Sequence, residues 1–323
     1  MSGFLERVDP ELLPGLEYSF RFPPPTSLAE LSAFRQNAEP AAGSASRDGV
    51  TIRDNSVDGL ALRTFTPDRP GPHPAVYWIH GGGMIAGTVD LDTAYCADLC
   101  ARVGAVVVAV EYRLAPEHPF PAPLQDVRAG LDWLFASAQS LSVDPGRVAV
   151  AGSSAGAGLA AALMLAHRDA QGPRLAFAYL MYPMLDSTHT SGSAREFTDI
   201  PTWNRAHSEF AWECYLGSSA AASPYAVPAH AADLSGLPPA LIQTGELDLF
   251  RDEDIAFAAR LLGAGVPTEL HVYPGAYHGF ELNCPDSYIG SKCLRDRDAA
   301  LIRALHGAPV PAPSPTPTEG SLL

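Results

Sequence analysis

Short apolar runs recur along the chain from about residue 75 onward, and stretches with helical spacing separate them. The runs are nearly continuous, as strands are in a parallel sheet that is covered on both faces. We expect six such strands, at residues 75–80, 105–112, 147–152, 175–183, 239–245 and 268–274. The helices between and after them are expected near residues 91–103, 123–139, 154–169, 252–263 and 287–306. This alternation predicts a doubly wound α/β fold with helices on both faces of a mostly parallel sheet.

Several segments depart from this alternation. Residues 50–67 alternate apolar and polar positions, which predicts an antiparallel hairpin that leads into the sheet. Residues 1–47 are helical at best, and a proline run interrupts them. Residues 187–233 follow a strand but are rich in Ser, Thr and Gly before an aromatic cluster. Residues 308–323 are rich in Pro, Ser and Thr, which predicts a disordered tail.

The chain changes from a strand-like to a helical pattern around Gly-Ser-Ser-Ala-Gly at residues 152–156. Gly-x-Ser-x-Gly between a strand and a helix is the nucleophile elbow, in which a strained serine projects its hydroxyl over the end of the sheet. The flanking glycines are needed because side chains there would collide with the neighbouring strand and helix. A plain loop before a helix is the alternative, but the flanking elements favour Ser154 as a nucleophile.

A serine hydroxyl needs a base to remove its proton, and that base is usually a histidine held by a carboxylate. In this type of fold the acid and then the histidine follow the serine along the chain. His278 lies in a glycine-flanked loop after the last predicted strand and suits this role. Asp248, in the loop after the preceding strand, is the favoured acid, and Glu246, closer to the end of that strand, is its rival.

An ester carbonyl under attack becomes an oxyanion, which backbone N–H groups can stabilise. One donor is expected from Ala155, the residue after the nucleophile, and another from a loop after an early strand. His-Gly-Gly-Gly at residues 80–83 is such a loop, and its glycines leave the backbone open to a substrate. A phosphate-binding loop is the alternative, but neither Gly-x-Gly-x-x-Gly nor a Walker lysine follows.

Five motifs occur together in this chain: HGGG at 80–83, EYRLAPEHPFPAPLQD at 111–126, GSSAG at 152–156, GELDLFRDE at 245–253 and HGF at 278–280. With them the chain resembles the hormone-sensitive-lipase-like esterases, which are the bacterial family IV carboxylesterases of the α/β-hydrolase fold. The chain departs from the commonest motifs at Ser153, where Asp or Thr is usual, and in the acid motif, where the departure leaves Asp248 in place.

The resemblance implies a triad of Ser154, Asp248 and His278, and an oxyanion hole formed by Gly82, Gly83 and Ala155. It also implies a core of residues 48–186 and 234–307 under a cap that is built from residues 1–47 and 187–233. We expect four aromatic residues of the second cap segment to line an apolar substrate pocket: Trp203, Phe210, Trp212 and Tyr215. The alternative is that they only pack the cap onto the core.

Composition narrows the range of partners. The net charge of −15 argues against nucleic acid or an anionic membrane surface as the main partner. No apolar run is long enough to span a bilayer, and the N-terminal residues lack the pattern of a signal peptide. The five cysteines lack a redox or zinc spacing, which favours reduced thiols in a cytoplasmic protein. We expect a small-molecule substrate, and a homodimer is one option for the assembly.

These observations predict a serine carboxylesterase that needs neither a metal nor a cofactor. It would hydrolyse short- to medium-chain acyl esters through an acyl-enzyme intermediate. Because the same triad would also attack an amide or a lactone, a hydrolase of another acyl bond is the closest alternative. A non-catalytic small-molecule receptor of the same fold is a further alternative, although no residue of the triad is missing.

Overall fold

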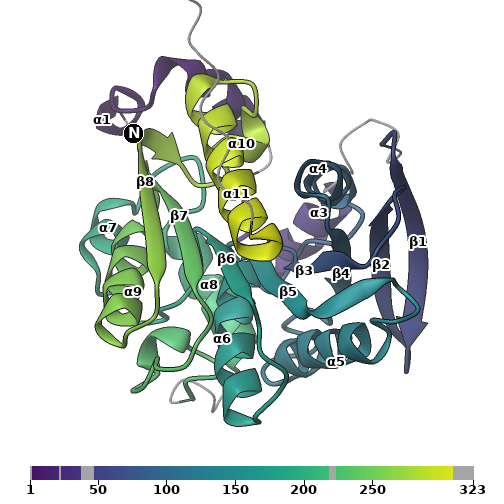
Figure 1. The fold of residues 1–323 in the computed structure, drawn as a ribbon. Coiled ribbons are helices and arrows are strands. Elements are labelled where there is room, and N and C mark those ends of the chain that lie inside the picture. The colour runs from purple at the N-terminus through teal and green to yellow at the C-terminus, as the bar shows by residue number, and fades with distance from the viewer. Residues whose placement is uncertain (1, 22, 38–46, 218–222, 308–323) are drawn as a thin grey trace, which may run out of the picture.

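A computed structural model of the protein describes residues 2–21, 23–37, 47–217 and 223–307. These residues form one eight-stranded sheet with the order β1-β2-β4-β3-β5-β6-β7-β8 (Figure 1). The strands are β1 (Val50–Val57), β2 (Leu60–Pro67), β3 (His73–Ile79), β4 (Val106–Glu111), β5 (Val143–Ser153), β6 (Phe177–Met181), β7 (Ala240–Leu247) and β8 (Thr268–Tyr277).

The sheet is antiparallel only at its N-terminal edge. Strand β1 pairs antiparallel with β2, and β2 pairs antiparallel with β4, whereas all the other neighbours are parallel. The predicted hairpin at residues 50–67 and the predicted mostly parallel sheet are therefore confirmed. Every residue of β3 and β6 is buried, as their unbroken apolar sequences require of strands that are covered on both faces.

Helices cover both faces of the sheet. The helices between and after the core strands are α4 (Thr93–Val103), α5 (Ala122–Ala136), α6 (Ala155–Asp169), α9 (Arg251–Gly263) and α11 (Tyr288–His306). Helices α4 and α11 pack together on one face, and α5 and α6 pack together on the other (Figure 1). Each lies within a few residues of its predicted range. Helix α6 is apolar almost all round, and all but three of its fifteen residues are buried.

Two segments add shorter helices to this core. The N-terminal segment contains α1 (Ser2–Leu5), η1 (Pro10–Gly15), α2 (Leu16–Arg21) and α3 (Leu28–Asn37). The insertion after β6 contains α7 (Gly192–Glu196), α8 (Arg205–Leu216) and η2 (Pro228–His230), and a last short helix, α10 (Phe280–Asn283), follows β8. The predicted tail at residues 308–323 lies outside the described residues.

Charged side chains bind the N-terminal segment and the insertion after β6 to the core. From α3, Arg35 donates to the carbonyl oxygens of Ile85 and Ala115, at 2.7 Å each. From α9, Glu253 accepts a hydrogen bond from the Leu185 N–H at 2.8 Å, where the insertion begins. Also from α9, Arg260 donates to carbonyl oxygens at residues 229 and 231, where the insertion returns. Helix α9 thus holds both ends of the insertion.

Candidate active site

The turn between β5 and α6 places Ser154 at the carboxyl edge of the sheet. Ser154 has a φ of 54° and a ψ of −121°, a strained conformation for a residue with a side chain. A methyl group on Gly156 would lie 2.1 Å from the Ile79 carbonyl oxygen, and one on Gly152 would lie 2.6 Å from the Gly156 backbone. Glycine at both positions is therefore what lets the strand turn so sharply into the helix, as the sequence predicts.

Three side chains from separate loops meet at this turn. His278, which follows β8, lies with its Nε2 atom 3.0 Å from Ser154 Oγ. Its Nδ1 atom lies 2.8 Å from Asp248 Oδ2. Asp248 follows β7 and is fully buried, and its other oxygen accepts a hydrogen bond from the Phe250 N–H at 2.9 Å. The carboxylate is thus fixed so that the Nδ1–H of the imidazole donates to it and Nε2 faces the serine.

The rival acid, Glu246, points elsewhere. Its carboxylate accepts hydrogen bonds from the Gly275 N–H at 3.0 Å and from Arg7 at 3.3 Å. The Gly275 hydrogen bond is the main cause that lowers the pKa of Glu246. The Glu246 side chain is 42% exposed, whereas that of Asp248 is 0% exposed. The contacts of Glu246 therefore join the N-terminal segment to the end of β8, just before His278.

The glycine run after β3 lies against the same turn. A methyl group on Gly81 would be 3.4 Å from Ser154 Cβ. Gly82 and Gly83 have φ values of +110° and +65°, and a methyl group on Gly82 would lie 2.2 Å from the Ala86 carbonyl oxygen. Because the N–H of Ala86 donates to the Gly82 carbonyl oxygen at 2.9 Å, the loop closes tightly on itself. Only glycine fits this close approach.

His80 supports the glycine run from beneath. Its ring stacks on Tyr112 with 4.2 Å between the centroids, and the Tyr112 hydroxyl donates to the His80 carbonyl oxygen at 3.0 Å. Burial lowers the pKa of His80 to about 4, so its imidazole is neutral at neutral pH. His80 and Tyr112 therefore hold the loop without adding a charge beside the serine.

The structure separates the four aromatic residues of the insertion. Trp203 packs on the glycine run, where its Cη2 atom would lie 2.6 Å from a methyl group on Gly83, and its ring is 6.5 Å from that of His278. Trp212 and Tyr215 pack together at 6.0 Å, and Tyr215 also contacts Phe120 at 5.9 Å. The fourth, Phe210, is half-buried against the core. Of these four aromatic residues, Trp203 is thus the one that the fold brings beside His278.

Sequence reasoning missed the residues that flank His278. The ring of Tyr182 lies 4.2 Å from the imidazole at a tilt of 49°, and the ring of Phe250 meets it edge-on at 5.4 Å. Tyr182 directly follows β6 and has a φ of 35°. Its hydroxyl donates to the buried carboxylate of Glu281 at 2.7 Å. Phe250 could have been found from its place two residues after Asp248, but no sequence signal distinguishes Tyr182 from a core residue.

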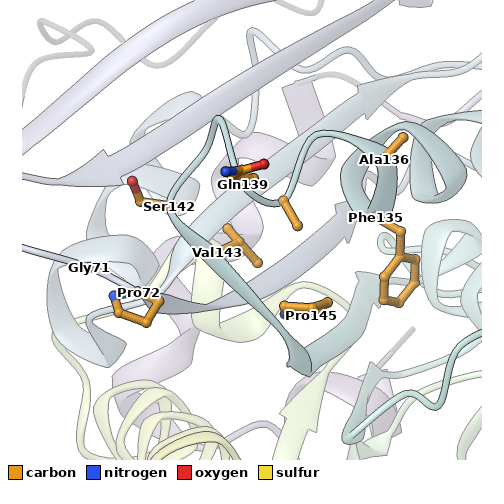
Figure 2. A pocket seen from close by; sticks show the side chains of 9 residues that line it. Gly71, Pro72, Phe135, Ala136, Gln139, Ser142, Val143 and Pro145 are labelled. Atoms are coloured by element: carbon orange, nitrogen blue, oxygen red, sulfur yellow. The ribbon is translucent and has the colours of Figure 1, made fainter.

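A separate pocket of about 640 Å³ lies at the amino ends of the strands, opposite the end of the sheet that carries Ser154 (Figure 2). Pro72, Val143 and Pro145 line it at the amino ends of β3 and β5, and Phe135 joins them from α5. Because Ser154 follows the carboxyl end of β5, this pocket is distinct from the triad.

Comparison with known proteins places the chain in a family. Residues 76–282 match a family model described as the alpha/beta hydrolase fold. The chain belongs to the α/β-hydrolase family. The match spans most of the chain and confirms the resemblance that the motifs indicate.

Similar proteins cover most of the chain. The carboxylesterase NlhH of Mycobacterium tuberculosis is 38% identical over 264 residues, which are 79% of this chain and 82% of the relative. A solved bacterial heroin esterase superposes with a TM-score of 0.85 at 38% identity and covers 93% of this chain and 98% of its own. The esterase LipW of Mycobacterium marinum has a TM-score of 0.85 at 36% identity, with coverage of 93% and 96%.

Neither a metal site nor a membrane-spanning helix occurs among the described residues. No three His, Cys, Asp or Glu side chains in the described ranges gather as a metal site would require. None of the helices in those ranges has the length and apolar character of a membrane span. All five cysteines are free thiols, four of them buried.

Proposed function

We propose that the protein is a carboxylic ester hydrolase and that it works through an acyl-enzyme intermediate on Ser154, with His278 as the general base and Asp248 as the acid that orients it. The observation that supports this most directly is the chain of hydrogen bonds from Ser154 Oγ through the imidazole to Asp248, at 3.0 and 2.8 Å. Nucleophile, base and orienting acid within hydrogen-bond reach are the signature of an activated serine.

In the first step, Ser154 Oγ attacks the ester carbonyl while His278 Nε2 takes the hydroxyl proton. The imidazolium then gives that proton to the leaving alcohol as the bond between the acyl carbon and the alkoxy oxygen breaks. A water molecule enters, His278 takes one of its protons, and the hydroxide attacks the acyl-enzyme. Collapse of this second tetrahedral intermediate releases the carboxylic acid and returns the proton to Ser154. Asp248 stays ionised and stabilises the imidazolium in both halves.

The oxyanion would be held by the N–H groups of Gly82, Gly83 and Ala155. Ala155 is the first residue of α6, and the N–H groups of a first helical turn have no partner within the helix. The dipole of this helix also favours negative charge at the same place. The position of Gly81 beside Ser154 Cβ brings the glycine run close enough to supply the other donors.

We further propose that the N-terminal segment and the insertion form a cap, and that Trp203 closes the acyl side of the pocket. Trp203 occupies the space above Gly83, next to the place where the reacting carbonyl would lie. An indole ring at this position restricts the volume available to an acyl group. This arrangement supports short- to medium-chain esters as substrates.

The proposal is tested first by Ser154→Ala, with Ser153→Ala as the matched control. Loss of the nucleophile should lower turnover by roughly 10⁴- to 10⁶-fold without changing the melting temperature. The control should keep most of the activity, since Ser153 ends β5 and its hydroxyl lies beside Gly81, outside the hydrogen bonds that join Ser154, His278 and Asp248. An organophosphate should label the wild type once, at Ser154. Labelling of Ser153, or a Ser154→Ala variant that still hydrolyses esters, would contradict the proposal.

A further inference from the structure

A second carboxylate lies behind the proposed base. Glu281 follows His278 by three residues, in the short helix α10, and its side chain is 2% exposed. Its Oε1 atom accepts the hydrogen bond from the Tyr182 hydroxyl at 2.7 Å. Its Oε2 atom is buried without a hydrogen-bond partner among the described residues. Burying a carboxylate oxygen without a hydrogen-bond partner costs free energy, which indicates that Glu281 has a role beyond packing.

Tyr182 connects this carboxylate to the imidazole. The tyrosine ring lies against His278 at 4.2 Å, and its N–H donates to the Gln243 carbonyl oxygen of β7 at 2.6 Å. With a φ of 35°, Tyr182 adopts a conformation that residues with side chains rarely take. The backbone bond to β7 and the hydroxyl bond to Glu281 hold it there. Tyr182 is thus fixed at both ends, with the face of its ring toward the imidazole.

We propose that Glu281 is a second positioning carboxylate for the triad, which fixes Tyr182 against His278 and whose negative charge stabilises the imidazolium. This inference rests on the proposed role of His278 as the base. A carboxylate near the imidazole attracts the positive charge that His278 carries in each transition state, and in a buried site this attraction is screened little. Glu281 needs no contact with the substrate to act in this way.

Burial raises the pKa of Glu281 to about 7, so its charge changes near neutral pH. The Tyr182 hydrogen bond opposes this rise because it favours the ionised form, as do the charges of His278 and Arg297. Several other titratable groups face Glu281 from the surrounding elements: Tyr95 of α4, Tyr179 of β6, Tyr277 of β8 and Cys293 of α11. Burial holds all four in their neutral forms, which leaves Arg297 and His278 as the cationic neighbours.

The test compares Glu281→Gln with Tyr182→Phe, using kcat/KM for a p-nitrophenyl ester between pH 5 and 9. Glu281→Gln keeps an acceptor for the tyrosine but removes the charge. Its plateau at high pH should be lower by about tenfold, and its acidic limb should move to lower pH because the imidazolium loses a stabilising neighbour. Tyr182→Phe keeps the carboxylate but removes the bond that favours its ionisation. Its acidic limb should move to higher pH, and its plateau near pH 9 should lie between those of the wild type and Glu281→Gln, because the carboxylate is then ionised but no longer holds the ring.

The proposal is supported if the acidic limb moves to lower pH in Glu281→Gln and to higher pH in Tyr182→Phe. An unchanged profile in Glu281→Gln overturns it, as does an equal loss at every pH together with a lower melting temperature. If Glu281→Gln does not fold, the test rests on Tyr182→Phe. An acidic limb in the Tyr182→Phe profile at the same pH as in the wild type then overturns the proposal. Failure of the triad itself is distinguished by the organophosphate, which would then not label Ser154 in the wild type.

Discussion

At the scale of single residues, two acidic side chains that are close in the sequence have different surroundings in the structure. Asp248 and Glu246 are two residues apart, yet the irregular end of β7 directs Asp248 to His278 and Glu246 to Arg7 and Gly275. Side chains alternate along a strand, but the pairing of β7 with β8 shifts its register between Gly245 and Leu247. This irregularity directly precedes Asp248, in the loop that aims it at the imidazole.

Asp248→Asn should lower turnover on the order of 10⁴-fold, because an amide favours the wrong tautomer of His278. Glu246→Gln, its matched control, should cost far less, since the Glu246 side chain bonds to the β8 backbone at Gly275 and to a surface arginine rather than to His278. Both are measured as kcat on one ester at pH 8, with the melting temperature as the check on folding. Reversed sizes for the two variants would transfer the role to Glu246.

At the scale of elements, the start of α8 shows how a helix of the insertion is fixed. The Asn204 side chain accepts hydrogen bonds from the Ala206 and His207 N–H groups, at 3.0 and 3.3 Å. The His207 Nδ1 atom accepts in return from the Asn204 N–H at 3.2 Å, which completes a capping box. Only a neutral imidazole can accept this bond, and burial lowers the pKa of His207 to about 4.

His207→Gln should make the unfolding free energy of the protein fall less as the pH is lowered. The unfolded chain binds a proton at His207 near pH 6.5, whereas the folded protein binds it only near pH 4. The stability that neutral His207 contributes is therefore complete above pH 6.5, falls progressively as the pH drops from 6.5 to 4, and is lost below pH 4. Glutamine fills the same capping position without titrating. Between pH 8 and 4.5 the wild type should lose about 2–3 kcal/mol more unfolding free energy than the variant.

Urea denaturation at the two pH values measures this difference. His80 also titrates on unfolding, but it is common to both proteins and cancels in the comparison. At pH 8 the two proteins should agree to within about 1 kcal/mol. An equal loss in both proteins at pH 4.5 would show that His207 does not carry the effect.

At the scale of the whole molecule, the insertion after β6 reaches back over loops from the first half of the sheet. Trp203 lies on Gly83, whereas Tyr215 lies beside Phe120 and its carbonyl oxygen accepts the Phe120 N–H at 2.7 Å. Helix α9 holds both ends of the insertion through Glu253 and Arg260. The placement of Trp203 above the triad is therefore a consequence of contacts between segments that are far apart in the sequence.

Trp203→Ala should change the choice of substrate more than the stability. The lost contact is next to the reacting carbonyl, so acetyl esters should lose about 10- to 200-fold in kcat/KM, which corresponds to roughly 1–3 kcal/mol. Longer acyl groups should lose less because they can fill the space that the ring vacates. The measurement is kcat/KM for acetyl to decanoyl esters alongside the melting temperature. Trp212→Phe is the control, and equal losses on all esters in both variants would mean that Trp203 only packs.

The sequence by itself determined the element order, the parallel core and the elbow, because these follow from local patterns of apolar residues and from glycines that no other residue can replace. It also ordered Ser154, Asp248 and His278 along the chain, since each follows a recognisable strand. The tertiary structure placed Asp248, and not Glu246, beside His278, because the orientation of both side chains depends on an irregular strand end. It separated Trp203 from Trp212 and Tyr215, and it brought Tyr182 and Glu281 behind His278. These outcomes depend on packing between segments that are far apart in the sequence, and such packing produces no periodic pattern of apolar residues.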